Sequence, residues 1–321
     1  MPFFTDSYQA MNSTFSIRLD FAHADEPLEN QIKLLFKRLR LTTETLEQCM
    51  SRFRIDSELS FLNAHVGEAI RVSTLMASVL KKTQEAYEWS HGLFDPRVIR
   101  VLQSIGYVGV LETGDSEQGV DGRRDNPLFI WHDEHVIELN APIDLGGIGK
   151  GYTVDFLANL VLQTFSKDEL AGFLVNAGGD VLLYGCQENG EPWSVGVENP
   201  FSPKEIFAAI RVTEALVAVC TSSKWRRKWK HEGREMHHLI DPRTGEPVHS
   251  EVMSVTALGT EAAMAEILTK RVFIGDEWWR DEQARYLVID EKKRLMFTPT
   301  LAEQLIWVTP DVSSVRPLKA R

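Results

Sequence analysis

The strongest constraint on the fold is a change in hydrophobic periodicity along the chain. Apolar residues recur at helical spacing in 29–49 and 73–90, where Ser73 is a plausible N-cap. After residue 128, short apolar or alternating runs typical of strands dominate, at 128–143, 173–185, 215–220 and 253–259. This change predicts an α+β fold with mixed or antiparallel sheets and intimately packed helices.

A few elements are exceptions to this trend. Residues 153–163 and 261–273 predict helices within the strand-rich part, and residues 8–20 predict a strand within the helix-rich part. The length of 321 residues allows one domain covering 1–321. Two intimate halves are the alternative, helix-rich over about 1–110 and strand-rich over about 128–321.

Composition and charge exclude several classes of protein. With 43% apolar and 25% charged residues, the chain is globular rather than disordered. The three cysteines, Cys49, Cys186 and Cys220, are too few and too dispersed for a disulfide framework or a CxxC zinc site. A net charge of −11 argues against nucleic acid as the main partner. No apolar run reaches the length of about 18 residues needed to span a membrane.

The segment Lys224–Lys230 mixes basic and aromatic residues, as nucleic-acid-binding segments do. Because the chain as a whole is acidic, we favour an exposed hairpin or a partner-facing loop there. The N-terminus has no basic flank or apolar signal core, so we expect a cytoplasmic protein without a signal peptide.

Four glycines fall within Asp144–Gly151, between an apolar strand and a helix. Such a loop lets a ligand approach the backbone closely, and a helix start offers free N–H groups to an anion. The spacing matches neither a Walker loop nor the dinucleotide fingerprint. A tight structural turn and a phosphate or polar-ligand site both remain open, and Asp144 and Lys150 favour the ligand site.

Three further features carry weaker signals. His237 and His238 are adjacent on an expected strand and would face opposite sides, so only one would enter a given site, where it could act as a general base. Asp95 precedes a proline, which favours an extended backbone. Glu266 and Lys270 lie one helical turn apart, which by default predicts an ion pair on a helix surface.

Together, and in this order, these segments resemble the FAD:protein FMN transferase family, also called the thiamine-biosynthesis lipoprotein family. The resemblance extends from Tyr8 to about Gly275. The matching segments are 8–14, 51–63, 92–96, 144–152 with Asp155, 175–180, 221–222 and 238–245.

The resemblance implies transfer of FMN from FAD to a Thr or Ser hydroxyl of an acceptor flavoprotein, with release of AMP and the help of Mg²⁺. It implies His238 as the catalytic base, with His237 as the fallback. The residues that it implies for FAD binding are Met11, Phe53, Leu93, Phe94, Asp95, Asp144, Lys150 and Leu239. For the metal it implies the backbone carbonyl of Gly147, together with Glu266 and Thr269.

The chain departs from the family at the metal motif, where relatives usually carry Ala-Asp-x-x-x-Thr. Here Glu266 replaces the Asp, Lys270 replaces the Thr, and Thr269 lies one residue earlier, about 100° around the helix. This departure predicts weakened magnesium binding. Two alternatives to the transferase stay open: a metal-dependent FAD pyrophosphatase that uses water as the acceptor, and a flavin-binding or delivery protein without turnover.

Overall fold

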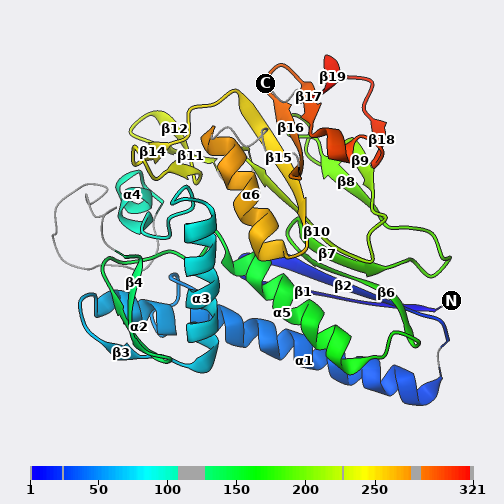
Figure 1. The fold of residues 1–321 in the computed structure, drawn as a ribbon, viewed down its shortest axis with the longest axis horizontal. Coiled ribbons are helices and arrows are strands. Elements are labelled where there is room, and N and C mark those ends of the chain that lie inside the picture. Colours follow the sequence, from blue (N-terminus) through cyan, green and yellow to red (C-terminus); the bar gives the residue numbers. More distant parts are fainter. Residues whose placement is uncertain (1, 24, 108–126, 226–227, 276–282, 319–321) are drawn as a thin grey trace. The chain divides into compact units, whose positions relative to one another are not determined.

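The computed structural model describes residues 2–23, 25–107, 127–225, 228–275 and 283–318 (Figure 1). The chain forms two compact units, each assembled from separate segments. Unit 1 contains Met1–Thr43, Lys150–Ser223 and Ser250–Arg321, and unit 2 contains Glu44–Gly149 and Lys224–His249. Helices and mixed sheets occur together, which confirms the predicted α+β class.

A nine-stranded sheet forms the centre of unit 1, in the order β1-β2-β6-β7-β10-β15-β16-β17-β19. Neighbouring strands are antiparallel except for the parallel pair β17 and β19. The bounds are β1 Phe3–Ala10, β2 Ser13–Phe21, β6 Leu170–Ala177, β7 Asp180–Gly185, β10 Leu216–Ser223, β15 Val252–Gly259, β16 Arg285–Asp290, β17 Arg294–Phe297 and β19 Ser314–Pro317. A second sheet, ordered β18-β9-β8, is built from β8 Ser194–Glu198, β9 Ile206–Arg211 and β18 Leu305–Val308, with a 3₁₀ turn at Pro299–Leu301.

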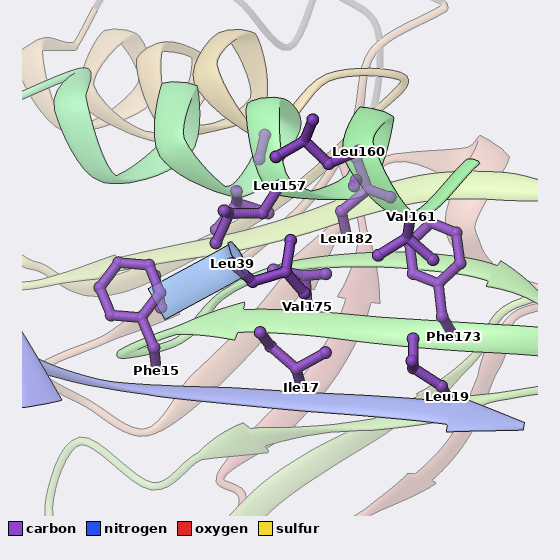
Figure 2. Close-up of a cluster of buried hydrophobic side chains, with 14 of the residues drawn as sticks. Phe15, Ile17, Leu19, Leu39, Leu157, Leu160, Val161, Phe173, Val175 and Leu182 are labelled. Atoms are coloured by element: carbon purple, nitrogen blue, oxygen red, sulfur yellow. The ribbon is translucent and has the colours of Figure 1, made fainter. Parts of the chain in front are cut away.

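The main apolar core of unit 1 lies between this large sheet and the helices packed on it. Figure 2 shows α5 (Gly149–Thr164) directing leucine and valine side chains toward β2 and β6. The alternating residues Phe15, Ile17 and Leu19 of β2 are fully buried there. The first part of α1 (Glu26–Met50) contributes Leu39 to the same cluster. Helix α6 (Ala262–Ile274) packs on β10 and β15.

The described part of unit 2 contains the end of α1, three further helices and small sheets. The helices are α2 Glu58–Ala64, α3 Thr74–Trp89 and α4 Ile99–Ser104. As predicted, Ser73 caps α3, because its hydroxyl accepts a hydrogen bond from the Met76 amide. A three-stranded sheet and two hairpins are built from β3 Ile70–Arg71, β4 Phe129–Asp133, β5 Val136–Leu139, β11 Lys228–His231, β12 Arg234–His237, β13 Ile240–Asp241 and β14 Glu246–Pro247.

The single strand predicted for residues 8–20 is wrong. These residues belong to two strands, β1 and β2, joined by a two-residue turn at Met11 and Asn12. Both turn residues have positive φ, 52° and 53°, which matches the tight turns that join twisted antiparallel strands. The apolar alternation of β2 is evident in the sequence, whereas the turn lacks the glycine that usually marks one.

Two further expectations concern segments that the structure describes only in part. The basic-aromatic stretch contributes Lys228–Lys230 to a hairpin strand, while residues 226–227 lie outside the described residues. In the described part of the chain, no helix is both long and apolar enough to cross a membrane.

Candidate functional site

Four charged side chains form a buried cluster within unit 1. Lys150 comes from α5, Asp180 begins β7, and Glu266 and Lys270 come from α6. The Lys150 ammonium donates to the Asp180 carboxylate and lies 3.4 Å from Glu266 Oε1. Lys270 Nζ lies 3.1 Å from the same Glu266 oxygen. No side chain of the four is more than 16% exposed, so two positive and two negative charges balance each other away from water.

This balance determines how the two carboxyl groups ionise. Burial raises the pKa of Asp180, and the neighbouring Glu266 charge acts in the same direction while Lys150 opposes it. Burial would also raise the pKa of Glu266, but Lys150 and Lys270 outweigh it, and the pKa is lowered. Glu266 is therefore held as the carboxylate, whereas Asp180 is the more easily protonated of the two.

The glycine-rich motif positions this cluster through close contact between α5 and α6. A Cβ atom on Gly151 would lie 2.7 Å from the Ala263 backbone, so only glycine fits without a shift. The Gly151 amide donates to Glu266 Oε2 over 3.3 Å. Asp155 caps α6, because its two carboxylate oxygens accept hydrogen bonds of 2.7 and 2.9 Å from the Ala262 and Ala263 amides.

The side chains predicted to bind magnesium do not fit a divalent ion in this arrangement. Glu266 Oε1 is shared by two ammonium groups, which take the place of the cation. The Thr269 hydroxyl is buried, donates to the Glu266 carbonyl over 2.7 Å and lies 2.6 Å from Ser222 Oγ. Among the described residues, no three His, Cys, Asp or Glu side chains come together as a metal site would require. The default expectation of a surface pair is also wrong, since the Glu266 side chain is buried and that of Lys270 is only 15% exposed.

In unit 2, a buried ion pair links two parts of the predicted FAD site. Arg52 Nε donates to Asp144 Oδ2 over 2.7 Å, and Asp144 Oδ1 accepts the Gly146 amide over 2.6 Å. The Asp144 amide donates to the Pro96 carbonyl over 2.8 Å. Asp144 therefore lies beside the segment that contains Asp95.

The side chains of the Leu93–Asp95 segment are largely engaged within the chain. The Leu93 and Phe94 side chains are buried. The Asp95 carboxylate accepts hydrogen bonds from the Arg97 amide and from Arg97 Nε, each over 2.9 Å. Arg97 was not predicted as a site residue, and neither was Arg52, although Arg97 lies two residues after Asp95 and Arg52 directly precedes Phe53.

The two histidines differ in environment. His237 ends β12, and its Nε2 lies 3.2 Å from the Val248 carbonyl. Burial, with the positive charges of Lys224 and Lys228, lowers the pKa of His237 to about 4. His238 lies just beyond the strand rather than on it, and is half-buried. His237 is therefore a weak base that is bonded to the backbone, and the assignment of His238 as the catalytic base stays a prediction.

The remaining predicted residues divide between the units. Met11 of unit 1 lies in the β1–β2 turn, with its sulfur 3.6 Å from Thr153 Oγ1 of α5. Phe53 and Gly147 belong to unit 2, where Phe53 is half exposed and Gly147 half-buried. Leu239, also of unit 2, is buried, and its carbonyl accepts the Val248 amide over 2.9 Å.

Comparison with solved structures shows that the chain shares its fold with ApbE proteins. The crystal structure of the ApbE protein from Thermotoga maritima has a TM-score of 0.78 at 23% identity, covering 95% of this chain and all of that one. The flavin transferase ApbE from Vibrio cholerae has a TM-score of 0.75, also at 23% identity, covering 95% of this chain and 99% of that one.

Sequence comparison then gives the family. Residues 11–287 match the sequence model of the ApbE family, and the chain belongs to this family. A Vibrio cholerae relative named FAD:protein FMN transferase is 27% identical over 276 residues, which cover 83% of this chain and 80% of the relative. A relative of the same name from Escherichia coli K12 is 31% identical over 244 residues, covering 72% of this chain and 68% of the relative.

Proposed function

We propose that this chain is an FAD:protein FMN transferase. The observation that carries the proposal is the match over most of the chain, 276 residues, to a relative of that name. Two residues that the family resemblance implies support the proposal: Lys150, whose side chain is 16% exposed and pairs with Asp180, and the half-buried His238. The comparisons favour neither the pyrophosphatase nor the flavin-delivery alternative.

The chemistry is the replacement of the pyrophosphate bond of FAD by a phosphate ester bond to the acceptor. The acceptor Thr or Ser oxygen bonds to the phosphorus of the FMN half, and the bond from that phosphorus to the AMP oxygen breaks. His238 is proposed to take the hydroxyl proton. Lys150, with Asp180 as its partner, is proposed to stabilise charge on the phosphate oxygens. The assignment of Met11, Phe53, Leu93–Asp95, Asp144 and Leu239 to FAD binding stays a prediction.

Magnesium dependence also stays a prediction, and no step is assigned to a metal because the described side chains do not fit one. A divalent ion would supply positive charge to the pyrophosphate. In this chain the two ammonium groups of the cluster already supply positive charge at the carboxylates. A cytoplasmic location and the single domain covering 1–321 are likewise predictions.

The direct test is to incubate the protein with FAD and a candidate acceptor flavoprotein, with and without Mg²⁺, and to measure the mass of the acceptor. The proposal predicts an added mass of one FMN and an equal amount of AMP. An acceptor in which the Thr or Ser is replaced by Ala is the control. Formation of free FMN and AMP without a modified acceptor would show a pyrophosphatase instead, and FAD binding without any product would show a delivery protein.

A further inference from the structure

Unit 2 contains a buried guanidinium group, two of whose nitrogen donors have no acceptor in the described part of the chain. The Arg52 side chain is 1% exposed, and only its Nε is engaged, with Asp144. Nη1 and Nη2 are buried, and no described residue accepts a hydrogen bond from either. Since buried donors are almost always paired, two unpaired donors on one charged group need an explanation.

Aromatic rings surround this guanidinium. Arg52 Cζ lies 4.2 Å from the centre of the Phe53 ring and 5.1 Å from the centre of the Tyr107 ring. Tyr107 in turn packs against Trp229 at 4.9 Å, and the Trp229 indole donates to the Ile105 carbonyl over 2.6 Å. These contacts hold the planar group in place but provide no oxygen acceptor for Nη1 or Nη2.

The arrangement differs from that of Arg97 in the same unit. Arg97 also pairs with a carboxylate, that of Asp95, and also lies over a ring, that of Tyr87. Its Nη2, however, donates to both Asp95 and the Tyr87 hydroxyl. Arg97 is therefore satisfied within the chain, whereas Nη1 and Nη2 of Arg52 have no acceptor among the described residues.

We propose that Arg52 is a ligand-binding residue whose Nη1 and Nη2 donate hydrogen bonds to acceptor oxygens of the flavin nucleotide. The inference rests on the proposed function for the identity of the ligand. Phe53 is 50% exposed, so its ring can turn away from Arg52 without opening the core, and its face remains available to stack on a planar ligand. Asp144 fixes the guanidinium through Nε and leaves the other two nitrogens for the ligand.

Two parts of FAD carry suitable oxygens: the pyrophosphate, and the carbonyl groups of the isoalloxazine ring. Simpler ligands separate them, because riboflavin has the ring but no phosphate, whereas AMP has a phosphate but no isoalloxazine. We expect Arg52→Lys, which retains the charge but loses the planar fork, to weaken FAD binding about 10- to 100-fold, as the loss of a hydrogen bond from a charged group would.

The experiment is a calorimetric titration of wild type and Arg52→Lys with FAD, riboflavin and AMP. Arg71→Lys is the matched control, since Arg71 pairs with Asp133 in the same unit but is exposed to solvent. If Arg52→Lys, but not the control, weakens the binding of both FAD and riboflavin, the contact is made through the ring carbonyls. If it weakens the binding of both FAD and AMP, the contact is made through phosphate. Unchanged affinity for all three ligands overturns the inference.

A second pair of variants keeps the test valid if Arg52→Lys does not fold. Arg52→Gln combined with Asp144→Asn removes both buried charges together, and Asp144→Asn alone is its reference. The double variant should bind FAD more weakly than the reference, and equal affinities would overturn the inference. If wild type binds no FAD, the proposed function fails. If wild type binds FAD and modifies the acceptor but Arg52 has no effect, only this inference fails.

Discussion

Replacing Lys270 with threonine should change the unit 1 cluster from internally neutral to magnesium-responsive. In the native cluster, Lys150 and Lys270 balance Asp180 and Glu266. Removing the Lys270 ammonium leaves one uncompensated negative charge on buried side chains. A divalent cation is then favoured where in the native protein it would be repelled.

The size of the effect follows from the geometry. Removing one partner of a buried ion pair costs about 3–5 kcal/mol, and Lys150 at 3.4 Å from Glu266 keeps the loss near the lower end, about 3 kcal/mol. For 321 residues, an unfolding entropy of about 0.7 kcal/mol/K converts this loss to a fall in Tm of about 4 °C. Magnesium at about 100 times its Kd would restore about 2.7 kcal/mol, most of that loss.

The assay is thermal unfolding with and without MgCl₂. The Tm of Lys270→Thr should fall without magnesium and rise again with magnesium. The double variant Glu266→Asp with Lys270→Thr should show a larger change of the same kind. Lys270→Arg is the control, because it retains the positive charge and should respond as wild type does. If wild type is stabilised by magnesium as much as the double variant, then Lys270 does not substitute for the metal and the reasoning is refuted.

Four further predictions concern other parts of the chain. His238→Ala should lower the rate of FMN transfer by about 10²–10⁴-fold while FAD affinity is retained. If His237→Ala loses activity and His238→Ala does not, His237 is the base instead. Titrations should show tighter binding of FAD than of FMN or riboflavin, and equal affinities would contradict a site that contacts the adenylate half. Gly151→Ala should destabilise the protein by about 1–3 kcal/mol in denaturant unfolding, because the new Cβ meets Ala263 at 2.7 Å, whereas Gly259→Ala, with its nearest contact at 3.5 Å, should cost less. The pKa of His237 is lowered to about 4 in the folded protein, from about 6.5 in the unfolded chain, so the unfolded chain binds the proton first as the pH falls. The free energy of unfolding should therefore decrease as the pH falls from about 6.5 to 4. His237→Gln should flatten this part of the profile of stability against pH.

Elements with a strong local signal were predictable from the sequence. The helix over 73–90 was expected from apolar spacing and the Ser73 cap, and α3 spans Thr74–Trp89. The strand broken at Gly178-Gly179 appears as β6 and β7, joined by these two residues with φ of 63° and 107°. The first hairpin was missed because its turn residues, Met11 and Asn12, have positive φ without glycine.

Features that depend on tertiary contacts were not predictable in this way. The spacing of Glu266 and Lys270 predicts an ion pair, but not that the pair is buried or that Lys150 shares it. The pairing of Arg52 with Asp144 joins residues 92 positions apart, and no local pattern indicates it. The division of the chain near residue 110 stays a prediction, whereas the two units of the structure interleave segments from distant parts of the chain.

The glycine-rich motif illustrates why a structural turn and a ligand site are not exclusive interpretations. Gly151 and Asp155 act on packing, since one permits the approach of α6 and the other caps it. Lys150 and Asp144 are charged side chains with buried partners, and Asp144 also shapes the turn, because its Oδ1 accepts the Gly146 amide. The Lys150 ammonium instead pairs with Asp180 and Glu266, and desolvating such charges is unfavourable. A tight turn alone therefore explains Asp144 but not Lys150, and this supports the proposal that Lys150 binds a charged group of the nucleotide.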